Sequence, residues 1–345
     1  MSPSADPIPV TLLTGFLGSG KTTLLNHLLR HQPLTAVVMN EFGEVGLDHQ
    51  LLEETRGPLA LLSGGCVCCQ IQGSLAPTLK NLWMGRNDGK LPPYQRIIIE
   101  TTGIADPAPV LDTLLNERWI AVRHRMDGVV TTVDAGLGAG QLHDYPEARR
   151  QVATADRILL TKTDLAHPEA RAATEARLEQ LNPAAPRLEV LNGQLDPALI
   201  LDAGLFTGQR PPDVTRWLAV DRYQPVRTGL TGAWPAPLPA HQESRIRAFT
   251  LRYAQPLDEG GLAAALDMLL AFRPKNLLRM KAIVNLAGRD KPQVLHAVQH
   301  VLYPPAELPA WPDEDHSSRF VFITADLEEE FVARLLDDFT RAATA

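Results

Sequence analysis

The sequence predicts an α/β fold, with a mostly parallel sheet covered by helices on both faces and a smaller α+β domain after it. Across residues 1–206, short apolar segments alternate with amphipathic ones, which is the pattern of strands joined by crossover helices. The apolar segments lack a polar residue at every second position, so these strands should be buried on both faces. A proline-rich stretch at 207–243 then separates a second pattern of strands and helices.

The expected strands of the first domain are short and rich in branched apolar residues, at 10–13, 36–39, 96–100, 128–133 and 157–161. The expected helices carry apolar residues at helical spacing, at 21–30, 73–83, 107–117, 145–155 and 169–181. Pro107 suits the first turn of its helix, because its missing N–H would have no partner there.

The second domain is expected at 244–345, after a linker at 207–243 whose prolines favour loosely packed chain. Its expected strands have mixed apolar and polar residues, at 245–253, 277–286, 294–302 and 319–324. Its expected helices are 259–271 and 327–341. This pattern indicates a small α+β domain.

Composition excludes several classes of protein. The 345 residues are 45% hydrophobic, which is enough for buried cores. The net charge of −7 disfavours a general nucleic-acid binder. There is no apolar run of about 18 residues and no basic-then-apolar start, so we expect neither a membrane span nor a signal peptide. The three cysteines fall within residues 66–69, where disulfide geometry is poor, which favours the reducing cytoplasm.

A phosphate-binding loop is the strongest motif. Residues 15–22 read GFLGSGKT, which fits G-x-x-x-x-G-K-[ST] between an expected strand and an expected helix. In such a loop backbone N–H groups surround phosphate oxygens, Lys21 reaches the β- and γ-phosphates, and Thr22 binds Mg²⁺. The residues expected to hold the nucleotide here are Gly15, Gly18, Ser19, Gly20, Lys21, Thr22 and Thr23. The alternative is a glycine-rich turn that only begins a helix.

An acidic residue closes the apolar strand at 96–100. Glu100 can hold Mg²⁺ directly or through water, and Gly103 allows a backbone N–H to approach the γ-phosphate as a switch. We therefore assign Lys21, Thr22 and Glu100 as the catalytic set. The alternative is an ordinary carboxylate at a strand end.

Residues 161–164, at the end of the strand expected at 157–161, indicate guanine binding. P-loop GTPases carry N-K-x-D here, and this chain has Thr161, Lys162, Thr163 and Asp164. The carboxylate of Asp164 can accept two hydrogen bonds from guanine that adenine cannot donate, and the Lys162 stem can pack along the base. Thr161 replaces the usual asparagine, so we expect the site to lose one bracing amide. A polar loop is the alternative.

Three thiols in four residues indicate a metal site. Cys66, Cys68 and Cys69 are soft ligands suited to Zn²⁺ or Cu⁺. In an extended segment Cys66 and Cys68 would share a face while Cys69 pointed away, so two thiolates, or three if the segment turns, would bind one ion. A tetrahedral ion would then take an outside ligand, for which Glu41 and Glu44 are candidates. A redox or persulfide role is the alternative.

Histidines give weaker signals. The four-residue spacing of His296 and His300 would pair them on a metal only in a helix, and surface or core-edge positions are expected instead. His316, in an acidic loop, is a weak candidate for a cation contact.

At these residues the chain resembles the CobW-type family of P-loop GTPases, which act as or are proposed as metal chaperones. The resemblance spans nearly the whole chain, and the matching strings are TLLTGFLGSGKTTLLNHLL, NEFGEVGLD, LSGGCVCC, IIIETTGIADPAPV, DGVVTTVDA, ADRILLTKTDL, LLRMKAIVNLAG and VQHVLY. It implies a P-loop GTPase domain that binds Mg²⁺ and GTP through residues 15–22 and Glu100. It also implies guanine recognition by Lys162 and Asp164, and zinc at the three cysteines.

These observations together predict a cytoplasmic GTPase that couples its nucleotide state to delivery of a divalent metal, most often zinc, to an unidentified metalloprotein client. Bound GTP would bring Glu41 toward the thiolates, and hydrolysis to GDP would loosen the ion. A nucleotide- or metal-dependent dimer is a further expected partner state. The alternatives are a metal buffer or sensor that GTP regulates, a cobalt-handling accessory protein for cobalamin synthesis, and an ATP-dependent P-loop enzyme.

Overall fold

The computed structural model describes residues 6–32, 34–40, 59–62, 66–70, 74–201, 218, 246–273 and 275–341, with the backbone alone at 40, 59–62, 66–70 and 341. The chain forms two compact units, and each is described by itself. The expected linker at 207–243 lies outside the described residues except for Leu218. Among the described helices, none combines the length and the apolar character needed to cross a membrane.

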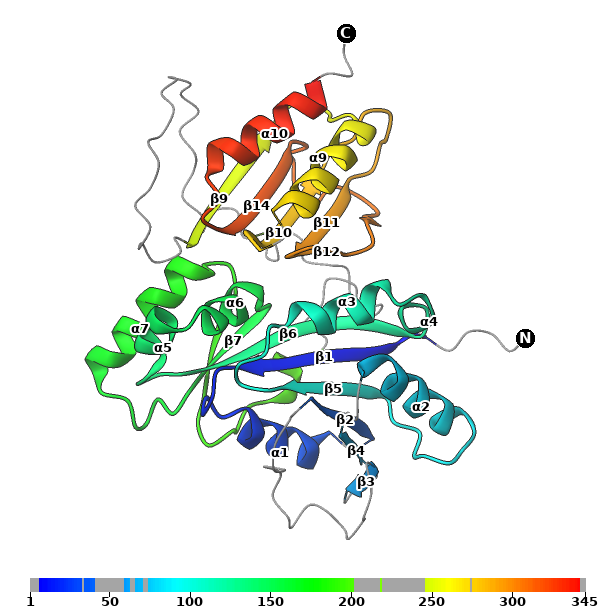
Figure 1. Ribbon diagram of the computed structural model, residues 1–345, viewed down its shortest axis with the longest axis vertical. Coiled ribbons are helices and arrows are strands. Elements are labelled where there is room, and N and C mark those ends of the chain that lie inside the picture. The colour runs from blue at the N-terminus through cyan, green and yellow to red at the C-terminus, as the bar shows by residue number, and fades with distance from the viewer. Residues whose placement is uncertain are drawn as a thin grey trace. The chain divides into compact units, whose positions relative to one another are not determined.

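The first unit contains an eight-stranded sheet in the order β3-β4-β2-β5-β1-β6-β7-β8 (Figure 1). Its strands are β1 (Ile8–Gly15), β2 (Thr35–Asn40), β3 (Leu59–Leu62), β4 (Cys66–Gln70), β5 (Arg96–Thr101), β6 (His124–Asp134), β7 (Arg157–Thr161) and β8 (Arg187–Val190). All neighbouring strands are parallel except β3 and β4. The predicted α/β class is therefore confirmed.

Helices cover both faces of this sheet, with α1 on one face and α3 and α6 on the other (Figure 1). The helices are α1 (Lys21–His31), α2 (Leu75–Asn87), α3 (Ala108–Asn116), α4 (Arg118–Ala121), α5 (Gly138–Asp144), α6 (Pro146–Thr154) and α7 (Pro168–Leu181), followed by the short turn η2 (Pro197–Leu199). Leu24 and Leu28 of α1 are buried against Leu13, Ile98 and Val130 of the central strands. The five expected strands and five expected helices of this unit are present, and the sequence missed β3, β4, β8, α4 and α5.

The parallel arrangement brings several strand ends to one edge of the sheet. Leu13 in β1 pairs with Glu100 in β5, and Asp134 at the end of β6 pairs with Thr161 at the end of β7. The loops that follow β1, β5, β6 and β7 therefore meet at this edge, which is where ligands bind in open α/β sheets.

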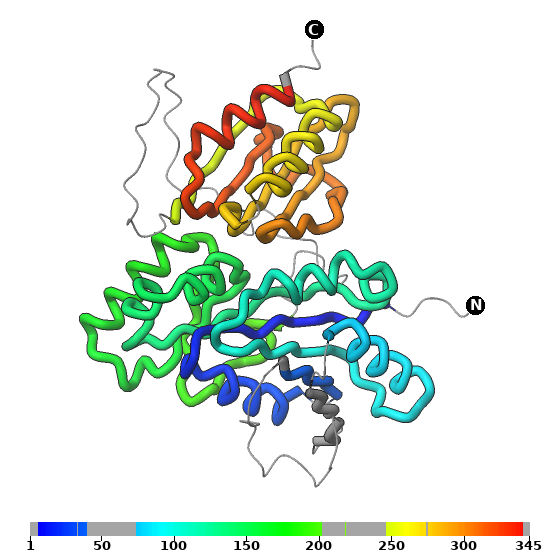
Figure 2. Tube along the Cα trace, viewed as in Figure 1, coloured from blue at the N-terminus to red at the C-terminus, as the bar shows by residue number. Residues whose placement is uncertain are grey.

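The second unit is an antiparallel sheet with two helices. Its strands are β9 (Ile246–Tyr253), β10 (Leu277–Val284), β11 (Gln293–Val298), β12 (Val301–Leu302), β13 (Ala306–Glu307) and β14 (Ser318–Ala325), in the order β12-β11-β10-β14-β9 with β13 beside β11. Helices α9 (Glu259–Phe272) and α10 (Glu329–Arg341) lie side by side across the sheet in Figure 2. Leu266 of α9 and Leu336 of α10 are buried with Phe320 and Phe322 of β14, which confirms the smaller α+β domain.

One predicted strand was wrong. The expected strand at 294–302 is divided into β11 and β12 by a tight turn at Gln299 and His300, where Gln299 has a φ of 51°. Because the two histidines lie on a hairpin, no helix brings them together. The ring of His296 stacks on Tyr303 at 4.1 Å, while His300 is exposed in the turn.

Candidate nucleotide and metal site

The phosphate-binding loop connects β1 directly to α1. Gly18 and Gly20 have φ values of 72° and 91°, a region that residues with a Cβ rarely adopt. No side chain of the described residues caps α1, which begins at Lys21. The N–H groups of its first turn are thus available to donate hydrogen bonds to an anion, and the helix dipole favours negative charge at this end of the helix.

Lys21 is held inside this loop. Its side chain is only 7% exposed, and Nζ donates to the carbonyl oxygens of Gly15 at 2.9 Å and Phe16 at 3.2 Å. The hydroxyl of the buried Ser19 hydrogen-bonds to that of Thr132 in β6 at 2.6 Å, which ties the loop to the sheet. Thr23 lies one residue beyond Thr22 in α1 and is exposed.

The two residues expected to bind Mg²⁺ are in contact. Thr22 Oγ1 donates to Glu100 Oε1 at 3.1 Å, and Glu100 is 2% exposed at the end of β5. A hydroxyl and a carboxylate beside a phosphate-binding loop are hard oxygen ligands of the kind that Mg²⁺ prefers. This donor set fits the ion.

The loop after β5 touches the phosphate-binding loop at Gly103. A Cβ added to Gly103 would lie 2.6 Å from the backbone nitrogen of Leu17 and 2.7 Å from its Cα. Real Cβ atoms do not approach backbone this closely, so only glycine fits. The backbones of the two loops therefore lie against each other, as a switch that responds to phosphate requires.

Thr161 contacts the phosphate-binding loop through its hydroxyl. Its hydroxyl lies 2.8 Å from the carbonyl oxygen of Ser19 in the phosphate-binding loop and 3.2 Å from that of Val133. The asparagine amide is absent, as expected, and a threonine hydroxyl donates to the phosphate-binding loop instead. The short side chain reaches it because β7 ends directly beside Gly20. The effect of this replacement on guanine preference stays a prediction.

Asp134 is a site residue that the sequence analysis missed. It is 4% exposed at the end of β6, and its Oδ2 lies 2.9 Å from Lys162 Nζ. Its other oxygen accepts from the backbone N–H groups of Gly136 and Leu137. A buried carboxylate thus holds the Lys162 side chain in place while the Lys162 backbone has a φ of 54°. The signal for it was an aspartate at a strand end, in residues 128–134.

Asp164 lies exposed in the loop after β7. No hydrogen bond or ion pair joins it to the described part of the chain, so its carboxylate can accept bonds from a ligand. The loop itself is anchored to β8, because Thr163 donates to Glu189, which also pairs with Arg171 at 3.2 Å. Hydrogen bonds from Thr163, which has the larger effect, and from Arg171 hold the pKa of Glu189 below its ordinary value.

The three cysteines lie on one strand, β4. Cys68 pairs with Val37 of β2 in parallel, and Cys66 pairs with Leu62 of β3 in antiparallel orientation. Since β2 also pairs with β5, only β2 separates the cysteine strand from the strand that carries Glu100. Neighbouring strands of a sheet lie about 4.8 Å apart, so β4 and β5 are separated by about 10 Å. Glu41 and Glu44, the predicted outside ligands, lie outside the described residues.

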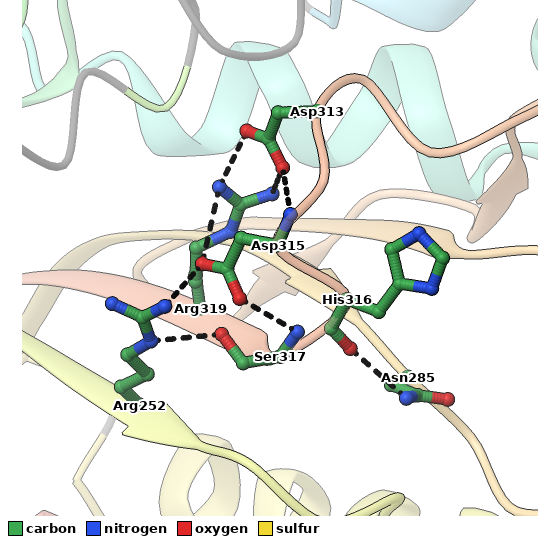
Figure 3. Close-up of polar contacts among 7 residues, drawn as sticks. All are labelled: Arg252, Asn285, Asp313, Asp315, His316, Ser317 and Arg319. Atoms are coloured by element: carbon green, nitrogen blue, oxygen red, sulfur yellow. Dashed lines mark hydrogen bonds and ion pairs between the residues drawn. The ribbon is translucent and has the colours of Figure 1, made fainter.

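A second polar cluster, in the C-terminal unit, is built from ion pairs (Figure 3). Arg319 donates to both oxygens of Asp313, at 2.7 and 3.0 Å, and Arg252 pairs with Asp315 at 2.6 Å. Burial raises the pKa of Asp315, but hydrogen bonds from Ser317 and Arg252 outweigh it, so the pKa lies below its ordinary value.

His316 does not join this cluster through its ring. The imidazole points away from the two carboxylates in Figure 3 and stacks on Trp311 at 4.8 Å. Among the described residues, no three His, Cys, Asp or Glu side chains converge on a metal position. The weak expectation of a cation contact at His316 thus has no support in this loop.

Comparison with protein families matches both parts of the chain. Residues 9–189 match the CobW/HypB/UreG nucleotide-binding domain. Residues 246–340 match the C-terminal domain of cobalamin synthesis protein CobW.

Named relatives point in the same direction. The chain is 34% identical to the zinc chaperone YjiA of Escherichia coli over 327 residues, which are 94% of this chain and 96% of that protein. It is 36% identical over 200 residues to zinc-regulated GTPase metalloprotein activator 1 of Schizosaccharomyces pombe, covering 55% of this chain but only 47% of that protein. The crystal structure of Zn(II)-bound YjiA GTPase from E. coli matches with a TM-score of 0.74 and 31% identity, over 97% of this chain and 99% of that one.

Proposed function

This chain belongs to the CobW/HypB/UreG family, and on that premise we propose that it is a GTP-hydrolysing zinc chaperone that delivers its ion to a metalloprotein client. Family membership makes it a GTPase. Zinc binding is supported by the relatives' names and by the three clustered cysteines. The metalloprotein client is supported by the name of the S. pombe relative alone.

The pairing of β2 with both the cysteine strand and the strand that carries Glu100 supports the proposal. Met39 of β2 pairs with Gln70 on one side and with Glu100 on the other. The cysteine strand therefore ends, across one intervening strand, at the level of the carboxylate proposed for Mg²⁺. A displacement of the β5 end on binding or losing the γ-phosphate would pass to the cysteine strand through β2, across its backbone hydrogen bonds to β5 and to β4.

In this proposal each residue has a defined task. Lys21 and the first backbone amides of α1 bind the β- and γ-phosphates, and Thr22 and Glu100 hold the Mg²⁺ ion that accompanies the nucleotide. Mg²⁺ bound there supplies positive charge to the phosphate oxygens. The backbone of Gly103, which lies against Leu17 of the phosphate-binding loop, contacts the γ-phosphate. Cys66, Cys68 and Cys69 bind zinc, with Glu41 as the outside ligand.

Asp164 selects guanine in this proposal, and its replacement tests that role. Asp164→Asn should lower the affinity for GTP about 10- to 100-fold, because the amide oxygen can accept only one of the two hydrogen bonds, the amide NH₂ opposes the other guanine donor, and the negative charge is lost. The affinity for ATP should stay the same. Titration of both nucleotides with Mg²⁺ present measures the two constants.

A matched control removes the same charge elsewhere. Asp267→Asn changes an exposed aspartate of α9 in the C-terminal unit and should alter neither affinity. Equal GTP affinities of the Asp164 variant and the unmodified protein would contradict guanine recognition by this residue. A preference of the unmodified protein for ATP would contradict the proposed function itself.

A further inference from the structure

A buried glutamine side chain hydrogen-bonds to the loop that follows Glu100. Gln151 lies on α6 and is fully buried. Its Nε2 donates to the carbonyl oxygen of Gly103 at 3.1 Å and to that of Ala105 at 3.0 Å. Both hydrogens of one amide group therefore bond to the loop that lies on the phosphate-binding loop.

The chemistry of the acceptors fixes the orientation of this amide. Both neighbours are backbone carbonyls, which only accept, so the NH₂ group and not the oxygen must face them. The Gln151 Oε1 atom is buried without a hydrogen-bond partner in the described part of the chain. Leaving a buried acceptor unsatisfied costs free energy, and the two hydrogen bonds to the loop offset this cost.

The backbone of Gln151 is itself anchored to the sheet. Its carbonyl oxygen accepts from the buried hydroxyl of Thr131 in β6 at 2.9 Å and from Thr154 at 3.1 Å. The next residue of β6, Thr132, hydrogen-bonds to Ser19 of the phosphate-binding loop. Both loops are thus held from β6, one through Gln151 and the other through Thr132.

An ion pair that also links α6 to this loop is weak. Arg150 lies 4.0 Å from Asp106, and both side chains are about a third exposed. Pairs of this kind contribute little, because water competes for both charges. The two buried hydrogen bonds of the Gln151 amide are sheltered from this competition.

We propose that Gln151 is a positioning residue for GTP, which holds the backbone of residues 103–105 where Gly103 can meet the γ-phosphate. This proposal rests on the proposed nucleotide site. GDP has no γ-phosphate, so Gln151 acts on the binding and hydrolysis of GTP and contributes little to the binding of GDP. The side chain touches neither nucleotide nor metal and acts only through the loop.

Two variants remove the donors in different ways. Gln151→Glu keeps the shape but places oxygen against two carbonyls, and Gln151→Met keeps the length without any polar group. Each should lower kcat for GTP about 10- to 100-fold, as small misplacements at a reacting phosphate do. Each should weaken a non-hydrolysable GTP analogue about tenfold while the affinity for GDP changes less than about threefold.

The matched control is Gln141→Glu. Gln141 on α5 lines the same small cavity as Gln151 but has no hydrogen bond to the loop in the described structure, so its variant should behave like the unmodified protein. Unchanged kcat and an unchanged ratio of analogue to GDP affinity in both Gln151 variants would overturn the inference. So would an equal loss of analogue and GDP affinity, which indicates general damage to the fold. If the unmodified protein binds no guanine nucleotide, the proposed function fails instead.

Discussion

Gly103→Ala is expected to lower kcat/KM for GTP by about 100-fold. The added Cβ would lie 2.6 Å from the backbone nitrogen of Leu17. Ordinary contacts of carbon are about 3.5–4.0 Å, so the two loops must separate by about 1 Å. A displacement of about 1 Å at a reacting centre costs about 100-fold in rate. Steady-state release of phosphate from GTP measures the effect.

The chain offers a control for the glycine change itself. Gly140 lies exposed in α5, and a Cβ there would meet nothing within 4 Å. Gly140→Ala should therefore retain the full rate. A Gly103→Ala protein as active as the unmodified one would show that contact between the two loops does not matter for catalysis. A comparable loss in both variants would point to the fold rather than the site.

Cys66→Ser is expected to weaken zinc binding by at least about 100-fold, because it removes one thiolate from a site with few ligands. Binding of GDP should change little, since none of the residues proposed to hold the nucleotide lies on the cysteine strand. Competition with a chromophoric chelator measures the zinc affinity, and titration with GDP on the same sample measures the nucleotide site.

The remaining two cysteines provide internal comparisons. Cys68→Ser and Cys69→Ser should each give a loss of similar size if all three thiols bind one ion. A cysteine whose replacement leaves the affinity unchanged is not a ligand. Unchanged zinc affinity in all three variants would contradict the proposed metal site.

Much of the first unit could be predicted because its local patterns agree with its tertiary structure. The strand 96–100 has three consecutive buried isoleucines, at 97–99, and lies inside the sheet, and GFLGSGKT occurs between a strand and a helix as its chemistry demands. Other elements carry weak signals. The residues of β8 are Arg-Leu-Glu-Val and only its last is fully buried, so no apolar run marks it. Cysteines in β4 suggest chemistry more strongly than they suggest a strand.

The division of 294–302 could not be predicted from turn residues. Two-residue hairpin turns usually contain glycine or asparagine, and this turn contains Gln299 and His300. The run therefore reads as one continuous strand. The turn becomes visible only in the structure, where Val298 pairs with Val301.

The parts of the candidate site that were missed depend on contacts between distant segments. Gln151 is 48 residues from Gly103, and Asp134 at the end of β6 pairs with Lys162 in the loop after β7. Nothing in the local sequence of either residue indicates what it contacts. The residue types at the phosphate-binding loop, in contrast, are dictated locally by backbone geometry and by phosphate chemistry.

The central claim is that the nucleotide and zinc sites are coupled, and zinc affinity in each nucleotide state tests it most directly. Chelator competition would be run with Mg²⁺ and a non-hydrolysable GTP analogue, with the corresponding ATP analogue, and with GDP. We expect the GTP analogue alone to tighten zinc binding, by a factor within the usual coupling range of about 5- to 150-fold. Equal zinc affinities in all three states would contradict the account, because coupling is reciprocal and zinc would then not alter nucleotide affinity either.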